Sequence, residues 1–179
     1  MSHATIRPAT LSDVADIADF HIRIWQQTYA GIAPAEAFEV LNLAHRQNQW
    51  RNTLSRTEPG NFVWIAEDQG RVVGLAACRP ASAPVFQPNG EITYLYIDPE
   101  CRGQGLGRRM LKTAMTFLQD HGFPGAALAV VRQNAPARRF YQRMGGIEAA
   151  EFTDPGPIWQ SEDILVVWPH FQVAEPCPA

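Results

Sequence analysis

Cysteine, histidine and lysine are scarce in this chain of 179 residues, which has 3 cysteines, 5 histidines and a single lysine beside 14 arginines. The cysteines, Cys78, Cys101 and Cys177, form no Cys-x-x-Cys pair, and the histidines are scattered without ligand spacing. Zinc sites and disulfide frameworks both need regularly spaced ligands. We therefore predict neither a metal site nor a set of disulfides.

Long apolar runs and an excess of charge of one sign are also missing. No run approaches the roughly 18–20 apolar residues of a membrane span, and the first residues lack the apolar core of a secretion signal. We therefore expect no membrane association and a cytoplasmic location. The 15 basic and 18 acidic residues give a net charge of −3. A general nucleic-acid binder is usually strongly basic, so we expect no nucleic-acid partner.

The length and the apolar content of 46% fit one domain with an ordinary core. We predict a single domain over residues 1–172 and a frayed tail over 173–179. Hydrophobic periodicity and turn residues predict a mixed α/β order. Strands are expected at 3–8, 62–67, 71–78, 91–97, 126–131, 147–152 and 163–168. Helices are expected to start near 14, 34, 45, 106 and 134, the first behind a capping box at Thr10 and Asp13.

A glycine-rich loop lies between the expected strand 91–97 and the helix that follows it. Gly103, Gly105 and Gly107 alternate with other residues, and the segment 102–143 carries eight basic residues and one acid. Glycine lets a backbone turn sharply and approach a ligand closely. The start of a helix offers free N–H groups and positive potential. The loop therefore indicates a cradle for a pyrophosphate, the alternative being a plain glycine-rich turn.

Two common phosphate motifs do not fit this loop. A Walker A loop ends in Gly-Lys-Ser/Thr, whereas Gly107 is followed by two arginines. A dinucleotide fingerprint needs Gly-x-Gly-x-x-Gly, and the required last glycine is Arg108 or Met110 here.

Instead, the loop resembles the acetyl-CoA motif of the GNAT family of N-acetyltransferases. That motif, Arg/Gln-x-x-Gly-x-Gly/Ala at a strand–helix junction, is matched by residues 102–107. A second family motif, Asn-x-x-Ala-x-x-Phe-Tyr-x-x-x-Gly-Phe, is matched at Asn134, Ala137, Phe140, Tyr141 and Gly145. Gly146 stands where the family has its final Phe. The stretch 6–14 also looks like a GNAT start, so the resemblance covers nearly the whole chain.

The resemblance implies an α/β (α+β) fold with a mixed, mostly antiparallel sheet of about six to seven strands, splayed in a V and flanked by helices. It implies acetyl-CoA as cosubstrate and no metal. A bulge near residues 95–97 would splay the central strand. The residues that the resemblance assigns to acetyl-CoA are Leu95, Tyr96, Ile97, Arg102, Gly103, Gln104, Gly105, Leu106, Gly107, Arg108, Asn134 and Ala137.

The catalytic roles follow from the same resemblance. Tyr141 would protonate the leaving thiolate as general acid, although a tyrosine at helical spacing can also be a core residue. Glu91, whose strand parity matches Leu95 and Ile97, would handle the amine proton, or would be a solvated residue at the start of a strand. Transfer would be direct, with Cys101 a loop residue beside the cofactor and no nucleophile.

The acceptor would be a primary amine of a small molecule or a protein. Trp25, Tyr29 and the loop residues 85–87 are candidates for its pocket, and aromatic residues there could equally belong to the core. A non-catalytic acyl-CoA-binding sensor or partner module is the alternative function. The resemblance also allows a homodimer.

Overall fold

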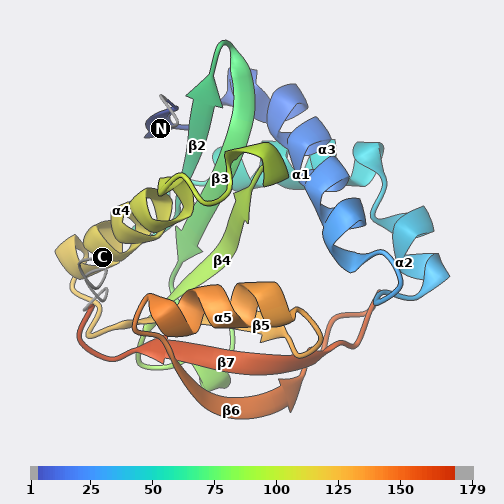
Figure 1. Ribbon diagram of the computed structural model, residues 1–179. Helices are drawn as coiled ribbons and strands as arrows, with labels where there is room; N and C mark the ends of the chain where they lie inside the picture. The colour runs from blue at the N-terminus through green and yellow to red at the C-terminus, as the bar shows by residue number, and fades with distance from the viewer. Residues whose placement is uncertain (1–3, 172–179) are drawn as a thin grey trace.

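The computed structural model describes residues 4–171, which form a seven-stranded sheet with helices on both faces (Figure 1). The strand order is β1-β2-β3-β4-β5-β7-β6, and only the β4–β5 pair is parallel. The strands are β1 Thr5–Pro8, β2 Phe62–Asp68, β3 Arg71–Arg79, β4 Gly90–Ile97, β5 Ala126–Val131, β6 Ile147–Thr153 and β7 Glu162–Trp168. The predicted fold class is thereby confirmed. The predicted tail at 173–179 lies outside the described residues.

Five α-helices cover this sheet: α1 Val14–Tyr29, α2 Ala35–Val40, α3 Leu43–Leu54, α4 Leu106–Asp120 and α5 Ala135–Arg143. Helices α1 and α3 pack on one face of β2 to β4, while α4 covers the other face. Helix α5 lies over β5 and β7 on the same side as α4 (Figure 1). The loop between β3 and β4 contains a short 3-10 helix, Pro84–Phe86, which the sequence did not indicate.

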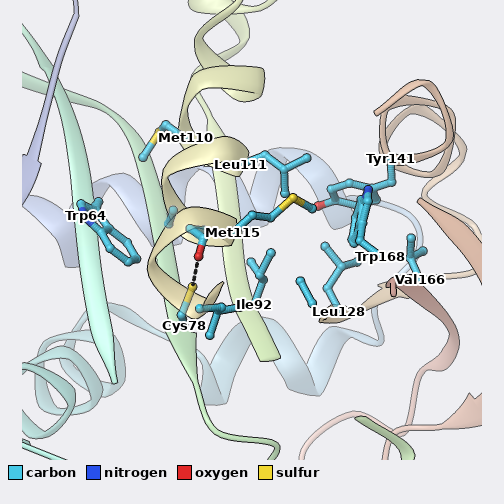
Figure 2. Close-up of a cluster of buried hydrophobic side chains, with 14 of the residues drawn as sticks. Trp64, Cys78, Ile92, Met110, Leu111, Met115, Leu128, Tyr141, Val166 and Trp168 are labelled. Carbon is cyan, nitrogen blue, oxygen red and sulfur yellow. Dashed lines mark hydrogen bonds between the residues drawn. The ribbon is translucent and has the colours of Figure 1, made fainter. Parts of the chain in front are cut away.

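The core between α4 and the sheet follows from the helical spacing of apolar residues in α4. Leu106, Met110, Leu111, Ala114, Met115 and Leu118 are all buried. Figure 2 shows this cluster, in which Leu111 and Met115 lie beside the Tyr141–Trp168 pair. Helix α4 therefore fixes α5 relative to β4, and both helices border the candidate site.

Strands β4 and β5 pair over only two positions, Gly90 with Ala126 and Glu91 with Ala127. From Ile92 in β4 and Leu128 in β5 onward the two strands separate, as Figure 1 shows. We call this region the splay. It divides the sheet into one part with β1 to β4 and another with β5, β7 and β6.

A bulge lies in β4, but not at the predicted place. Opposite β3, Cys78 pairs with Ile92 and Ala77 with Tyr94, which leaves Thr93 as an extra residue. The predicted bulge at residues 95–97 was therefore two residues too late. An extra residue reverses the alternation of side chains. The parity that was expected to join Glu91 to Leu95 is broken, because Leu95 packs on the α4 side with Ile92.

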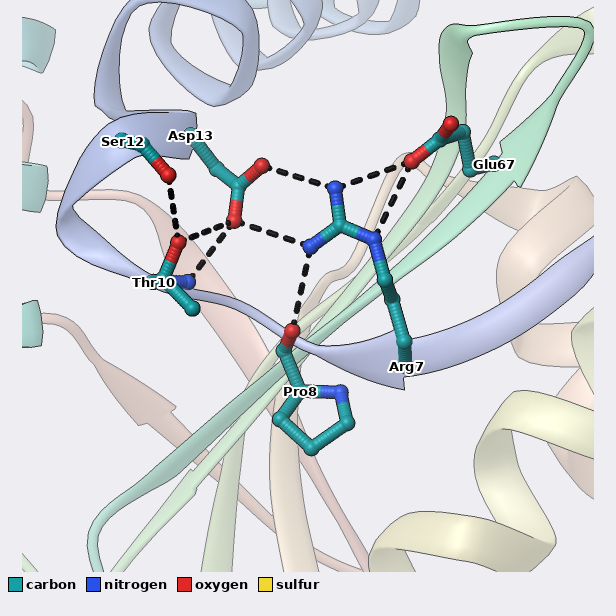
Figure 3. A network of polar contacts seen from close by, with 6 residues as sticks. All are labelled: Arg7, Pro8, Thr10, Ser12, Asp13 and Glu67. Atoms are coloured by element: carbon teal, nitrogen blue, oxygen red, sulfur yellow. Dashed lines mark hydrogen bonds and ion pairs between the residues drawn. The ribbon is translucent and has the colours of Figure 1, made fainter.

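The N-terminal strand and α1 are joined by a polar network centred on Arg7 (Figure 3). Arg7 Nη2 lies 2.8 Å from Asp13 Oδ1 and 2.8 Å from Glu67 Oε2. The Thr10 N–H donates to Asp13 Oδ2 at 2.8 Å, which confirms the predicted capping box. Hydrogen bonding from Arg7 lowers the pKa of Asp13 well below its usual range. The network fixes the start of α1 against β2.

Within residues 4–171 no helix is long and apolar enough to cross a membrane. The same residues contain no group of three or more His, Cys, Asp or Glu side chains that could hold a metal ion.

Candidate active site

The glycine loop follows a short 3-10 helix, Pro99–Cys101, after the end of β4; it leads into α4 and is exposed to solvent. Gly103 and Gly105 have φ values of +73° and +81°, which L side chains rarely adopt. A Cβ atom on either glycine would meet nothing within 4 Å. The glycines are therefore required by the backbone conformation and not by crowding inside the protein.

Helix α4 begins without a side-chain cap. Gly105 is the N-cap residue and offers no side chain to cap the helix. The first backbone bond into the helix runs from the Arg109 N–H to the Gly105 oxygen at 3.1 Å. Uncapped N–H groups and the helix dipole favour an anion at this position.

Gly107 has a different role from the two glycines before it. A Cβ on Gly107 would lie 3.4 Å from Phe140 Cζ and 3.5 Å from Ile97 Cγ1. The small residue lets α4, α5 and the end of β4 come together. The predicted cofactor residues of the loop and of β4 are thus brought to one place.

The arginines around the loop differ in what they contact. The Arg102 Nε–H donates to the Ile97 oxygen at 3.3 Å, and the side chain is otherwise exposed. Arg109 donates to the Ala4 oxygen at 2.9 Å, so part of its capacity holds the N-terminal strand. Arg138 pairs with Glu148 at 2.8 Å. Of these three arginines, only Arg138 has its charge balanced by a carboxylate of the described residues, while Arg102 and Arg109 keep their charge and donate to backbone carbonyls.

The start of α5 also faces the splay. Asn134 caps this helix, since its Oδ1 accepts the Ala137 N–H at 3.3 Å. The predicted pair of Asn134 and Ala137 is thus held together by the cap. The side chains of Asn134 and Tyr96 both interact with the Tyr29 hydroxyl and lower its pKa, which burial raises more strongly. Residues of α1, β4 and α5 therefore meet at this point.

Tyr141 projects from α5 into the core and is only 7% exposed. Its ring packs edge-to-face on Trp168 at 5.9 Å between centroids (Figure 2). Burial, and to a smaller degree the neighbouring Tyr29, raise the pKa of Tyr141 well above its usual value. The phenol is therefore protonated at neutral pH and available as a donor.

Trp168 also explains the missing Phe of the second motif. A Cβ on Gly146 would lie 2.7 Å from Trp168 Cζ2 and 2.6 Å from Val166 Cγ1. The indole Nε1–H donates to the Met144 oxygen at 3.0 Å. The tryptophan thus fills the space beside the end of α5, and no side chain fits at residue 146.

Glu91 lies where β4 and β5 still pair, before the splay begins. Its carboxylate accepts from Arg79 Nη2 at 2.8 Å and Nε at 3.1 Å, and from the Ser82 N–H at 2.9 Å. These bonds tie the loop 80–89 to the start of β4. The structure does not bring Glu91 together with Tyr141.

An aromatic cluster connects the two parts of the sheet on the side away from α4. We call it the bridging cluster. Its principal members are Trp25, Tyr29, Phe38, Tyr96, Val131 and Trp159. Trp25 and Tyr29 were predicted for the acceptor pocket, and the structure places them here. Phe86, also predicted there, is instead buried against Ala127 and Leu165. On the same face of β5, between Ala127 and Val131, Ala129 is exposed.

Two buried charged residues beside the bridging cluster were missed by the sequence reasoning. Arg46 of α3 is 5% exposed and Asp163 of β7 is 6% exposed. The signal in the sequence was weak: Asp163 directly precedes the apolar run 164–168, and Arg46 lies in a polar helix. Neither pattern resembles a known motif.

Three features together define the class of protein: the splayed sheet, the glycine loop at the start of α4 and the asparagine cap of α5. The model of the Acetyltransferase (GNAT) family matches residues 20–146. The chain therefore belongs to the GNAT family, and it is an acyltransferase.

Two relatives of similar length support this assignment. The chain is 34% identical over 147 residues to the uncharacterized N-acetyltransferase YuaI of Bacillus subtilis, covering 82% of each protein. It is 33% identical over 132 residues to an uncharacterized N-acetyltransferase of Archaeoglobus fulgidus, covering 73% of this chain and 86% of the relative.

Solved structures show the same fold at lower identity. The PaiA N-acetyltransferase of Thermoplasma acidophilum in complex with coenzyme A has a TM-score of 0.74 at 21% identity, over 92% of this chain and 98% of that one. YncA of Salmonella typhimurium with acetyl-CoA has a TM-score of 0.69 at 22% identity, over 99% and 100%.

Proposed function

We propose that the protein is an acetyl-CoA-dependent N-acetyltransferase that moves the acetyl group directly to a primary amine of a small molecule or a protein. The observation that carries this proposal is the splay. From Ile92 to its end at Ile97, β4 has no partner strand on the β5 side within residues 4–171, and the start of α4, which has no side-chain cap, follows after the glycine loop. A long anionic thioester needs both features, a backbone edge for its arm and amide groups for its phosphates. The coenzyme A and acetyl-CoA in two structures of the same fold support it.

The cofactor would bind mainly through the protein backbone. Residues 102–108 would hold the pyrophosphate through the loop and the helix start. The main chain of Leu95, Tyr96 and Ile97 would hydrogen-bond the pantetheine arm along the unpaired edge of β4. Asn134 would bond to the same arm from the start of α5, with Ala137 beside it.

The chemistry needs a neutral amine, a stabilised oxyanion and a protonated leaving group. The amine nitrogen attacks the thioester carbonyl carbon, and an N–H of β4 would stabilise the oxyanion that forms. As the carbon–sulfur bond breaks, the Tyr141 hydroxyl would donate to the sulfur and CoA would leave as the thiol. The Tyr141 phenol is protonated at neutral pH, as this role requires.

The role of Glu91 is less direct than its position in β4 suggested. Its carboxylate is engaged by Arg79 and by the Ser82 N–H. We propose that it positions the loop 80–89 at the edge of the acceptor side and takes no proton from the amine. The non-catalytic sensor or partner module is not favoured, because the two relatives described above, which match most of the chain, are named N-acetyltransferases.

The test is thiol release from acetyl-CoA across a panel of amines, with CoA affinity measured by calorimetry on the same samples. Tyr141→Phe keeps the ring packing on Trp168 and removes only the hydroxyl. We expect a loss in kcat of about 100-fold or more with CoA affinity unchanged, the usual size of a general-acid contribution. Glu91→Gln should retain most of the activity. A Tyr141→Phe protein as fast as the wild type would contradict the assignment, and tight CoA binding without turnover of any amine would contradict the function.

A further inference from the structure

Arg46 places a positive charge inside the bridging cluster without a counter-ion. Its guanidinium carbon lies 5.7 Å from the centroid of the Trp25 ring, and Nη1 donates to Gln49 Oε1 at 2.8 Å. Its Nε is buried and makes no hydrogen bond. Within residues 4–171 no carboxylate forms an ion pair with it. Burying a charge in this way is costly unless a partner binds to it.

Asp163 places a negative charge on the other part of the sheet, also without a counter-ion. It lies on β7 opposite Val131 of β5, a member of the bridging cluster. Its Oδ1 is buried and has no hydrogen-bond partner. The charged groups that act on it, Asp154 and Glu162, are themselves acidic. No cation in the described part of the chain pairs with it.

Tyr29 connects the surroundings of these two charges. Its ring centroid lies 5.5 Å from that of Trp25, the ring that Arg46 faces, and Val131, opposite Asp163, belongs to the same cluster. Burial is the main cause that raises the pKa of the Tyr29 hydroxyl; the charge of Asp163 raises it further and the charge of Arg46 lowers it. This places Arg46 and Asp163 beside the splay, on the face of the sheet away from α4. A cofactor held by α4 and α5 would present its thioester to that side.

We propose that the acceptor is a small molecule carrying both a primary amine and a carboxylate, with Arg46 binding the carboxylate and Asp163 binding the ammonium group. The inference rests on the proposed acetyltransferase function and specifies its substrate class. A ligand with one charge of each sign would neutralise both buried groups at once. A monoanionic carboxylate matches the single positive charge of Arg46, and its two oxygens suit the planar guanidinium. A phosphate ester would keep excess negative charge in the site.

The same arrangement accounts for the proton that the amine must lose. The ammonium group gives one proton to the Asp163 carboxylate, and the neutral nitrogen then attacks the thioester carbonyl carbon. After the attack the nitrogen loses its second proton to solvent, while the Tyr141 proton passes to the CoA sulfur. Asp163 then gives its proton to solvent, and Tyr141 takes a new proton from solvent. Charge and atoms balance without a further reactant.

The experiment compares matched acceptors that differ only in the carboxylate. Phenylalanine is paired with phenethylamine and with phenylalanine amide, and leucine with 3-methylbutylamine. The readout is kcat/KM for thiol release, with the acetylated product identified by mass spectrometry. We expect kcat/KM for each amino acid to exceed that for its decarboxylated partner by about 100-fold, because a buried charge pair usually contributes an effect of this size. Equal or faster turnover of the plain amines, or of peptide amines, would overturn the inference and leave the proposed function standing.

Variants then assign the preference to the two residues. Arg46→Met keeps the aliphatic stem and removes the charge, and Arg51→Met on the exposed face of the same helix is the matched control. We expect Arg46→Met to raise KM for amino acids by about 100-fold while plain amines are unaffected. Arg46→Lys should recover part of the loss, and Asp163→Asn should lower kcat/KM for every amine. Equal losses on both acceptor types in Arg46→Met, in a protein with unchanged CoA affinity, would show a structural role and refute the assignment. Turnover of no amine by the wild type would overturn the proposed function together with this inference.

Discussion

Replacement of Asp163 by asparagine tests the electrostatics of the acceptor side without any ligand. Burial, with a smaller contribution from the charges of Asp154 and Glu162, raises the pKa of Asp163 from 3.8 to about 6, against the hydrogen bond from Ser161. A tenfold change in a protonation equilibrium is worth ~1.4 kcal/mol, so the charged form is about 3 kcal/mol less favourable in the folded protein than in the unfolded chain. Relaxation of the surroundings and screening by solvent reduce this to about 1–3 kcal/mol.

The sign of the effect depends on pH. Because the folded pKa lies above the unfolded value, the group favours folding while it is protonated, and this contribution is lost as the pH rises from about 4 to about 6. Asp163→Asn cannot ionise and keeps a polar partner for Ser161. The variant should therefore have nearly the wild-type free energy of unfolding at about pH 4, and exceed it by about 1–3 kcal/mol at about pH 7.5.

Urea denaturation followed by fluorescence and circular dichroism at several pH values gives both free energies. The linear extrapolation is adequate here, since the comparison needs only differences at equal slope. A variant more stable than the wild type by the same amount at both pH values would refute the buried charge as the cause. If Asp163→Asn were less stable than the wild type at neutral pH, the ionised carboxylate would be stabilised in the folded protein by a group that binds to it.

Two further predictions concern glycines. Gly105→Ala should weaken CoA binding by about 10-fold or more. The control is Gly122→Ala, because Gly122 has nearly the same φ of +80° and equally open space around it. Both variants should lose about 1 kcal/mol of stability, since alanine disfavours a positive φ, but only Gly105→Ala should lose CoA affinity. Calorimetry on both variants checks this, and equal CoA affinities would argue against the cradle. Gly146→Ala should lower the free energy of unfolding by about 1–3 kcal/mol, because its Cβ would overlap Val166 and Trp168, and a melting temperature equal to that of the wild type would contradict the packing described.

Most elements could be predicted from the sequence because their signals are local. The apolar spacing in α4, the Asn134 cap of α5 and the short apolar run of β5 each act over a few positions. The predicted bounds of β5, residues 126–131, agree with the structure to the residue. Motif positions in the glycine loop and α5 were found for the same reason.

The remaining features depend on contacts between distant segments. The extra residue at Thr93 is set by the pairing of β4 with β3, which alternation along one strand cannot reveal. The engagement of Glu91 by Arg79 comes from a neighbouring strand. Arg46 and Asp163 are 117 positions apart in the numbering, and only the folded sheet brings both beside Tyr29. Local patterns could not predict a site built from such separate parts.

The splay has a consequence for where the sheet keeps its unpaired backbone edges. Exposed strand edges are templates for pairing with other chains, and proteins protect them. Here the outer strands are protected by simple means: β1 has 4 residues and ends at Pro8, and β6 carries Glu148 and Glu151. The edges that remain without a partner, of β4 from Ile92 and of β5 from Leu128, lie in the middle of the sheet and are flanked by α4, α5 and the bridging cluster. The unpaired backbone edges beside the splay therefore lie inside the sheet and not at its outer margin, where strands of other chains pair most readily.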